Sequence, residues 1–120
     1  MELVRAVPIL TVDDLDEAVR MYTSLLGLDV LMNHGWIATL GNSDATGGAA
    51  PQFSLMTADA TAPVNPVASL QVPDVDAAYA QALADGVEIV HPLCDEEWGV
   101  RRFFFRDADG NVVNVLSHRR

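Results

Sequence analysis

The residues best suited to chemistry are three histidines, His34, His91 and His118, and the single cysteine, Cys94, which precedes the acidic run Asp95–Glu97. Imidazole, thiolate and carboxylate are the groups that bind zinc, and a thiolate beside a base can act as a nucleophile. The histidines come from a turn, a strand end and the last residues, with no spacing that would aim them at one point. No base partner for the cysteine can be named from the sequence. We therefore expect a small residue at a loop entry there, and we assign no catalytic residue.

Other chemical signatures are missing from the sequence. The chain has no glycine-rich phosphate loop, no nucleophile elbow and no HExxH pattern. Three arginines, Arg101, Arg102 and Arg106, cluster near the end of the chain but alternate with phenylalanine and lie beside acids. We interpret them as the solvent face of a strand or as partners of nearby carboxylates.

The elements that position these residues begin with a β-branched strand over Val4–Val12. Asp14 followed by Glu17 resembles a capping box, and apolar residues then recur at helical spacing until Gly27 ends the helix. Three further segments are predicted to be strands: Leu28–Met32, Trp36–Leu40 and Gln52–Thr57. The segment Gly41–Ala50 between the last two is predicted to be a loop.

The same order then begins again sixty residues later. A strand over Val67–Val72 leads to Asp74 as a helix cap, and Gly86 closes the second helix. Positions of the first strand and helix recur at this spacing: Leu10, Val12, Asp14, Asp16 and Ala18 return as Leu70, Val72, Asp74, Asp76 and Ala78. Strands at Val87–Val90, Val100–Arg106 and Val112–Ser117 complete the copy. The chain is therefore predicted to be a tandem βαβββ repeat.

The last two strands are predicted to form a hairpin. The run Arg101–Arg106 reaches the turn Asp107–Asn111, and Val112–Leu116 leaves it. Gly110 suits positive φ, and Asp107 can accept hydrogen bonds from the backbone of its own turn.

This order predicts an α+β fold in one domain, with module 1 at about 1–58, a linker at 59–66 and module 2 at about 67–120. Each helix has one apolar stripe and must cover one sheet face. The other faces are expected to form a curved mixed-sheet cup with the helices outside. Strand alternation and aromatic character predict the residues that line this cup: Val7, Ile9, Trp36, Phe53, Val67, Ser69, Trp98, Phe103, Phe105 and Asn114.

The net charge of −10, from seventeen acids against seven Lys and Arg, repels phosphate backbones and argues against nucleic-acid binding. The apolar runs are far shorter than the ~20 residues of a membrane helix, and the first residues do not resemble a signal peptide. We therefore expect a cytoplasmic protein that binds no membrane. The acidity mildly favours a cationic ligand.

The order and spacing of these motifs resemble the glyoxalase, bleomycin-resistance and extradiol-dioxygenase superfamily, also called the vicinal oxygen chelate group. The first strand and helix (AVPILTVDDLDEAVRMYTSLLGLDV) and the last hairpin (WGVRRFFFRDADGNVVNV) carry the resemblance, which covers essentially the whole chain. It implies paired βαβββ modules and commonly homodimers. Some members hold a divalent metal on the cup floor, and others bind antibiotics such as bleomycin without a metal.

The resemblance also implies where a metal would bind. The family's ligand positions fall on Val7, on Leu55 or its neighbour Met56, on Val67 and on Asn114. None of these is an imidazole or a carboxylate, so we expect no metal and no cofactor. The favoured function is metal-independent binding of a small, aromatic or cationic, antibiotic-like molecule. The alternatives are a lyase, isomerase or dioxygenase with an atypical or absent metal site, and a non-catalytic regulatory or self-assembly module.

Overall fold

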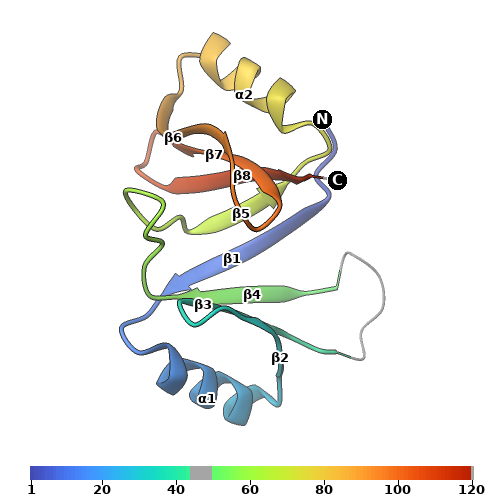
Figure 1. The fold of residues 1–120 in the computed structure, drawn as a ribbon, viewed down its shortest axis with the longest axis vertical. Coiled ribbons are helices and arrows are strands. Elements are labelled where there is room, and N and C mark those ends of the chain that lie inside the picture. Colours follow the sequence, from blue (N-terminus) through green and yellow to red (C-terminus); the bar gives the residue numbers. More distant parts are fainter. Residues whose placement is uncertain (44–49, 120) are drawn as a thin grey trace. The chain divides into compact units, whose positions relative to one another are not determined.

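The structure is a computed structural model that describes residues 1–43 and 50–119, drawn in Figure 1. Most of the predicted loop Gly41–Ala50 lies outside the described residues. The chain forms two compact units: one spans Val7–Asn65, and the other runs from Pro66 onward together with Met1–Ala6. Each unit contains a helix and a sheet in the order βαβββ, which confirms the α+β class and the tandem repeat. The cup remains a prediction.

The first unit has one helix packed on one face of a mixed sheet (Figure 1). The strand order is β2-β3-β4-β1, with β1 parallel to β4 and the other pairs antiparallel. The elements are β1 (Arg5–Thr11), α1 (Leu15–Leu26), β2 (Asp29–Asn33), β3 (Ile37–Gly41) and β4 (Gln52–Met56). The core between helix and sheet contains Leu15, Ala38, Leu40 and Leu55, all buried.

Helix α1 begins and ends where its sequence predicts. The carboxylate of Asp14 accepts a hydrogen bond from the Glu17 backbone N–H at 3.1 Å, which satisfies one free donor of the first turn. Gly27 adopts φ 66° and its N–H bonds the Thr23 carbonyl, so glycine ends the helix without a side-chain clash. The helix face packs on the sheet through Tyr22, whose ring meets that of Phe53 edge-on at 5.3 Å.

The second unit repeats this arrangement with its own core. Its strand order is β5-β8-β7-β6, with β5 parallel to β8, and α2 covers one face. The elements are β5 (Ala68–Gln71), α2 (Val75–Ala84), β6 (Glu88–Asp95), β7 (Val100–Arg106) and β8 (Val112–His118). The buried centre contains Val75, Phe103 and Val115, and the Tyr79 ring meets Phe103 at 5.0 Å.

The predicted hairpin between β7 and β8 is present. One carboxylate oxygen of Asp107 accepts from the backbone N–H groups of Asp109 and Asn111, both at 2.9 Å. Gly110 takes φ 89°, a conformation that side-chain-bearing residues rarely adopt. The turn therefore fixes the register of the two strands.

Strand β6 is longer than its predicted segment, Val87–Val90. It continues through Pro92 to Asp95. Two register shifts interrupt its regular pairing with β7, one between Ile89 and His91 and one between His91 and Cys94. Proline lacks the N–H of a regular ladder and is tolerated at such irregularities and on edge strands. The irregular strand changes which side chains share a face.

Three aromatic residues predicted to line the cup are in the helix-side cores instead. Phe53 packs against Tyr22 of α1, and Phe103 and Phe105 pack in the core under α2. The prediction is wrong for these three residues. In a run of three phenylalanines, the sequence does not tell which of them face the helix. In the structure Phe103 and Phe105 do, so Phe104 lies on the opposite face of the sheet.

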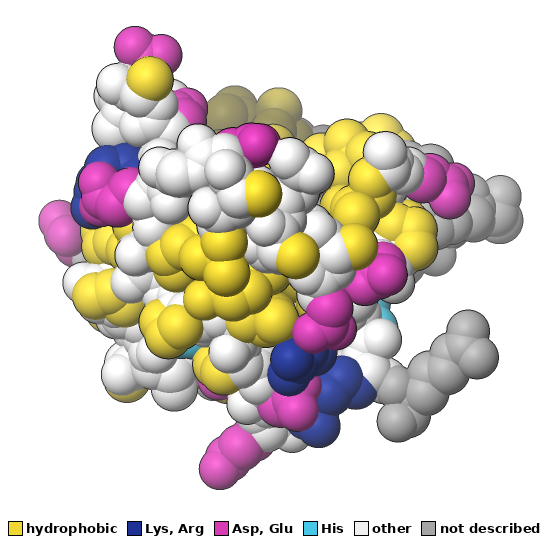
Figure 2. Space-filling model, turned by 90° about the horizontal axis from the view of Figure 1, so that it is seen from above, with side chains coloured by type: hydrophobic (Ala, Val, Ile, Leu, Met, Phe, Trp, Pro, Cys, Tyr) yellow, Lys and Arg dark blue, Asp and Glu magenta, His cyan; other side chains and the backbone are white. Residues whose placement is uncertain are grey.

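Arginine side chains on the surface pair with acidic ones rather than forming a basic patch. On the face shown in Figure 2, the arginine side chains lie next to acidic ones. Arg101 contacts Asp76 at 2.9 Å, and Arg106 contacts Glu88 at 3.0 Å. None of the helices among the described residues is long and apolar enough to cross a membrane.

Candidate functional site

The sheet of the second unit has one face that α2 does not cover, which we call the helix-free face. Cross-strand pairing places one residue from each strand in a row on it, in the order His91, Phe104, Asn114 and Ser69. The neighbouring residues of β7 and β8, such as Phe103 and Val115, belong to the core under α2. The row therefore follows from strand alternation, with the helix side apolar and this side carrying polar groups.

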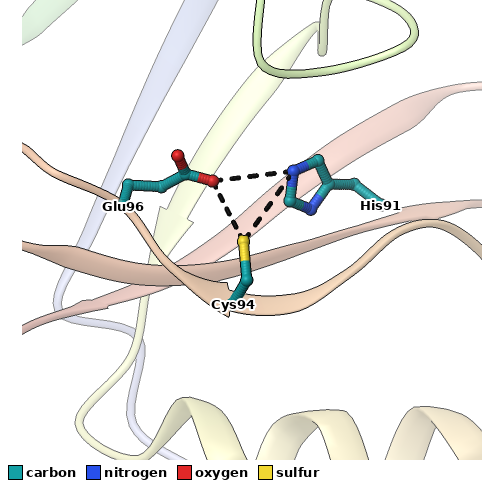
Figure 3. Close-up of side chains that lie close together, drawn as sticks. All are labelled: His91, Cys94 and Glu96. Carbon is teal, nitrogen blue, oxygen red and sulfur yellow. Dashed lines mark hydrogen bonds and ion pairs between the residues drawn. The ribbon is translucent and has the colours of Figure 1, made fainter.

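Two side chains of β6, His91 and Cys94, converge with that of Glu96, which directly follows the strand, as Figure 3 shows. The Cys94 sulfur lies 3.1 Å from Glu96 Oε1 and 4.0 Å from His91 Nε2, and the histidine nitrogen lies 3.6 Å from the same carboxylate oxygen. In a regular strand, His91 and Cys94 would point to opposite faces. The register shift between them brings them to one side, as bulges near functional sites do.

Arg102 of β7 completes the cluster. Its Nε atom donates to Glu96 Oε1 at 3.2 Å, and both side chains are almost fully buried. The guanidinium carbon lies 4.8 Å from the centre of the Phe104 ring and 4.9 Å from that of Trp98. Planar guanidinium groups stack favourably on aromatic faces, so the two rings hold this cation in place.

The cysteine of this cluster is not an activated nucleophile. Burial, followed by the hydrogen bond to Glu96, raises the pKa of the Cys94 thiol to about 11. Reactive cysteines instead have a lowered pKa, typically through a close imidazolium or a helix N-terminus. At neutral pH the thiol therefore keeps its proton and donates a hydrogen bond to the Glu96 carboxylate.

Asn114 stands at the centre of the helix-free face. Its amide nitrogen donates to the Ser69 hydroxyl at 3.0 Å. Its carbonyl oxygen is buried and has no hydrogen-bond partner among the described residues. An unpaired buried acceptor costs about 1–3 kcal/mol, so this oxygen has a hydrogen-bonding capacity that the described residues leave unmet.

The other predicted residues are distributed over both units. Val7 and Ile9 are on β1, on the strand face opposite to that of Val12, which packs on the core under α1. Trp36 precedes β3, and its carbonyl accepts from the Thr57 N–H. Val67 precedes β5 and is half exposed. The predicted residues that share the helix-free face of the second unit are Ser69 and Asn114, while Trp98 follows β6 and contacts Arg102.

The sequence matches the family model of the Glyoxalase/Bleomycin resistance protein/Dioxygenase superfamily over residues 3–115. The chain belongs to this superfamily. The match spans both units, which agrees with the resemblance of the first strand and the last hairpin. No curated protein matches the sequence significantly.

Several solved structures have a similar fold over nearly the whole chain. A member from Vibrio splendidus 12B01 matches with TM-score 0.69 and 18% identity, covering 97% of this chain and 99% of that one. Methylmalonyl-CoA epimerase of Streptomyces coelicolor matches with TM-score 0.66 and 20% identity, covering 98% and 97%. A structure described as an NAD-dependent benzaldehyde dehydrogenase of Legionella pneumophila matches with TM-score 0.72 and 16% identity, covering 95% and 99%. At these identities the likeness establishes the fold alone.

The positions that correspond to the superfamily's metal ligands do not fit a metal here. Val7 and Val67 have no donor atom, and Leu55 is fully buried in the core under α1. Its neighbour Met56 is also buried, and its thioether sulfur is a weak ligand for the divalent metals of this superfamily. Asn114 brings a neutral amide, whose nitrogen is engaged with Ser69. This donor set lacks the imidazole and carboxylate groups that hold divalent metals in proteins.

Sequence reasoning missed the cluster of His91, Cys94, Glu96, Arg102 and Phe104. The signal was present as H-x-x-C-x-E followed by an arginine, but regular alternation puts the first two residues of this pattern on opposite faces. Only the irregular pairing around Pro92 unites them, and a proline in a strand pattern is the local cue for such an irregularity.

Proposed function

We propose that this protein binds a small aromatic, cationic, antibiotic-like molecule on the helix-free face of its second unit, without help from a metal ion. The observation that carries the proposal is the buried carbonyl oxygen of Asn114, which lacks a hydrogen-bond donor among the described residues. A ligand N–H or ammonium group would satisfy it.

The polar groups near Asn114 suit a ligand with a donor better than an anionic ligand. The Ser69 hydroxyl accepts a hydrogen bond from the asparagine amide, and its own O–H can donate to an uncharged acceptor atom of the same ligand. Arg102, whose guanidinium lies against the Phe104 ring of this row, is bonded to Glu96. The net charge of −10 also raises the local concentration of cations around the protein.

Trp98 supplies an aromatic surface. Its side chain is 45% exposed, and one face of the indole meets the Arg102 guanidinium. Stacking an aromatic ligand on an indole contributes about 0.5–1.5 kcal/mol beyond the burial of apolar area. Aromatic walls with a few polar groups are typical of sites for small organic ligands.

The test is a fluorescence titration in the presence of EDTA, with planar aromatic amines as probes and matched neutral or anionic analogues for comparison. The expected result is saturable binding of the cationic members. In Asn114→Leu the affinity should fall about tenfold, the equivalent of about 1.4 kcal/mol, while the melting temperature stays equal or rises because a buried unpaired acceptor is gone. Asn42→Leu, an exposed asparagine of the other unit, is the matched control and should bind as the wild type does.

Two results would contradict the proposal. One is a panel in which no cationic aromatic compound binds saturably. The other is unchanged affinity in Asn114→Leu for a compound that binds the wild type.

A further inference from the structure

We propose that His91, Cys94 and Glu96 form a site for a divalent transition-metal ion, with zinc as the preferred ion. This site is separate from the superfamily's metal position, and it revises the sequence-based expectation that the chain binds no metal. Three potential ligand atoms, one nitrogen, one sulfur and one oxygen, lie within 4.8 Å of one another. Each side chain points toward the other two (Figure 3).

The distances match the edges of a coordination tetrahedron. Zinc bonds of about 2.3 Å to sulfur and about 2.0–2.2 Å to nitrogen or oxygen, at tetrahedral angles, place the ligand atoms roughly 3.4–3.6 Å apart. The observed separations are 3.1 Å for sulfur to carboxylate, 3.6 Å for imidazole to carboxylate and 4.0 Å for sulfur to imidazole. Side-chain adjustments of a few tenths of an ångström would bring all three atoms to bonding distance.

The histidine is already held in a metal-binding orientation. Its Nδ1 atom lies 2.8 Å from the Pro92 carbonyl oxygen, which can only accept a hydrogen bond. The proton of the neutral ring must then be on Nδ1, and Nε2 presents its lone pair to Cys94 and Glu96. Histidines that bind metals usually have their second ring nitrogen fixed in this way. The Phe104 ring, with its centre 5.1 Å from that of the imidazole, further restrains the orientation.

The charges around the cluster are compatible with a dication. A thiolate and the Glu96 carboxylate would contribute two negative charges, and Arg102 one positive charge, so a bound dication leaves a net charge of +1. A carboxylate has about four lone-pair sites, so Glu96 can keep its bond from Arg102 while it binds the ion. The guanidinium would then orient the carboxylate, as outer-shell partners of metal ligands do.

The ligand types select among metals. One soft thiolate, one imidazole and one carboxylate favour zinc and its cobalt substitute, whereas magnesium and calcium prefer oxygen ligands. Three protein ligands leave a fourth position for water or for an oxygen or nitrogen atom of a ligand. The site therefore has the coordination pattern of an open zinc centre rather than of a closed structural one.

The experiment is a titration of the chelator-treated full chain with Co²⁺ alone. The expected result is one ion per chain, with a thiolate-to-cobalt charge-transfer band in the near ultraviolet and visible bands of tetrahedral intensity, both bleached by one equivalent of Zn²⁺. Cys94→Ser should abolish the charge-transfer band, and His91→Gln and Glu96→Gln should each weaken binding at least tenfold. His34→Gln, which changes an exposed histidine of the other unit, is the matched control and should titrate as the wild type does.

A second measurement covers the case in which a variant is destabilised. Zn²⁺ should raise the melting temperature of the wild type and of His34→Gln but not of Cys94→Ser, because an ion that binds only the folded state stabilises that state. No charge-transfer band, or a band that persists unchanged in both His91→Gln and Glu96→Gln, would overturn the proposal. The second outcome would indicate a thiol that binds cobalt alone.

The cobalt titration and the ligand titration in EDTA together distinguish a failure of the metal site from a failure of the proposed function. Ligand binding that persists in EDTA, together with no cobalt band, contradicts only the metal site. A cobalt band together with ligand binding that EDTA abolishes supports the metal site and contradicts metal-independent recognition.

Discussion

Phe103 and Phe104 are neighbours in β7 yet belong to different parts of the second unit. The Phe103 ring meets Tyr79 of α2 at 5.0 Å, whereas the Phe104 ring lies 5.1 Å from His91 and beneath the guanidinium of Arg102. One residue fills the core and the next supports the candidate site. The sheet thus separates a face that stabilises the fold from a face that carries polar chemistry.

Phe103→Ala should be strongly destabilising, because it removes a ring that is 2% exposed in the centre of the core. Truncation of a buried phenylalanine costs about 3–5 kcal/mol, a large share of the stability of a small domain. Urea denaturation monitored by circular dichroism measures the change.

Trp98→Ala should lower the unfolding free energy much less than Phe103→Ala does, because Trp98 is not part of the core under α2. The half-exposed indole should contribute about 0.5–1 kcal/mol through its contact with Arg102. A loss as large as that of Phe103→Ala would place Trp98 in the core and remove it from the binding face.

The sequence carried enough information for the ends of α1 and for the last hairpin. Asp14 with Gly27 bounded α1, and the Asp107–Asn111 turn defined the last hairpin, because capping and turn conformations depend on a few local side chains. The sixty-residue repeat then predicted the second unit from the first. These features are local or repeated, so no long-range contact had to be known.

The faces of the strands were harder to predict. In three consecutive phenylalanines, strand alternation allows either Phe104 alone or Phe103 and Phe105 to face the helix. The packing of the strand against α2 places Phe103 and Phe105 under the helix. The cluster of His91, Cys94 and Glu96 depends on the register shifts between β6 and β7 around Pro92, and strand alternation does not specify where such shifts occur. Site geometry therefore depended on pairing that alternation alone does not specify.

Asp107→Ala should lower the melting temperature at neutral pH, because the turn loses the acceptor of its backbone N–H groups. Hydrogen bonds lower the pKa of the Asp107 carboxyl, and those from the side chain and backbone of Asn111 have the largest effect. A carboxyl with a lowered pKa stabilises the fold above its unfolded value of about 3.9, and this stabilisation is lost as the pH falls through the folded value. The wild type and the variant should therefore converge in acid.

Melting curves between neutral pH and about pH 3 test this expectation. Asp109→Ala is the control, since Asp109 takes part in the turn through its backbone N–H. A difference between wild type and Asp107→Ala that stays constant with pH would show that the charge does not contribute.

We expect the protein to be a homodimer, because chains of this superfamily commonly pair and the first unit exposes apolar side chains. These belong to α1 and β2: Met21, Leu25, Leu26, Val30 and Leu31. Sedimentation equilibrium at micromolar concentration should give twice the chain mass, and Leu25→Glu should shift it toward the chain mass. A wild-type protein that sediments with the chain mass at every concentration would rule the dimer out.

The thiol of Cys94 should react slowly in the metal-free protein. Its pKa of about 11 reflects burial and the bond to Glu96, so at pH 8 only about one thiol in a thousand is ionised, against roughly one in four for a free cysteine with a pKa of about 8.5. Alkylation by iodoacetamide in EDTA should therefore be about a hundredfold slower than in the urea-unfolded chain. The rate should rise with pH up to about pH 11.

The same pKa predicts a loss of stability in alkali. The unfolded thiol releases its proton near pH 8.5, while the folded thiol keeps its proton until about pH 11, so the folded state binds more protons between these values. Stability from this group is complete below pH 8.5 and declines as the pH rises toward 11. Cys94→Ala should lack this decline, so the difference in unfolding free energy between wild type and variant, measured by urea denaturation at several pH values, isolates the thiol. Parallel curves for the two proteins from neutral pH to pH 11, or alkylation as fast in the folded as in the unfolded chain, would show that Glu96 and burial do not hold the proton on Cys94.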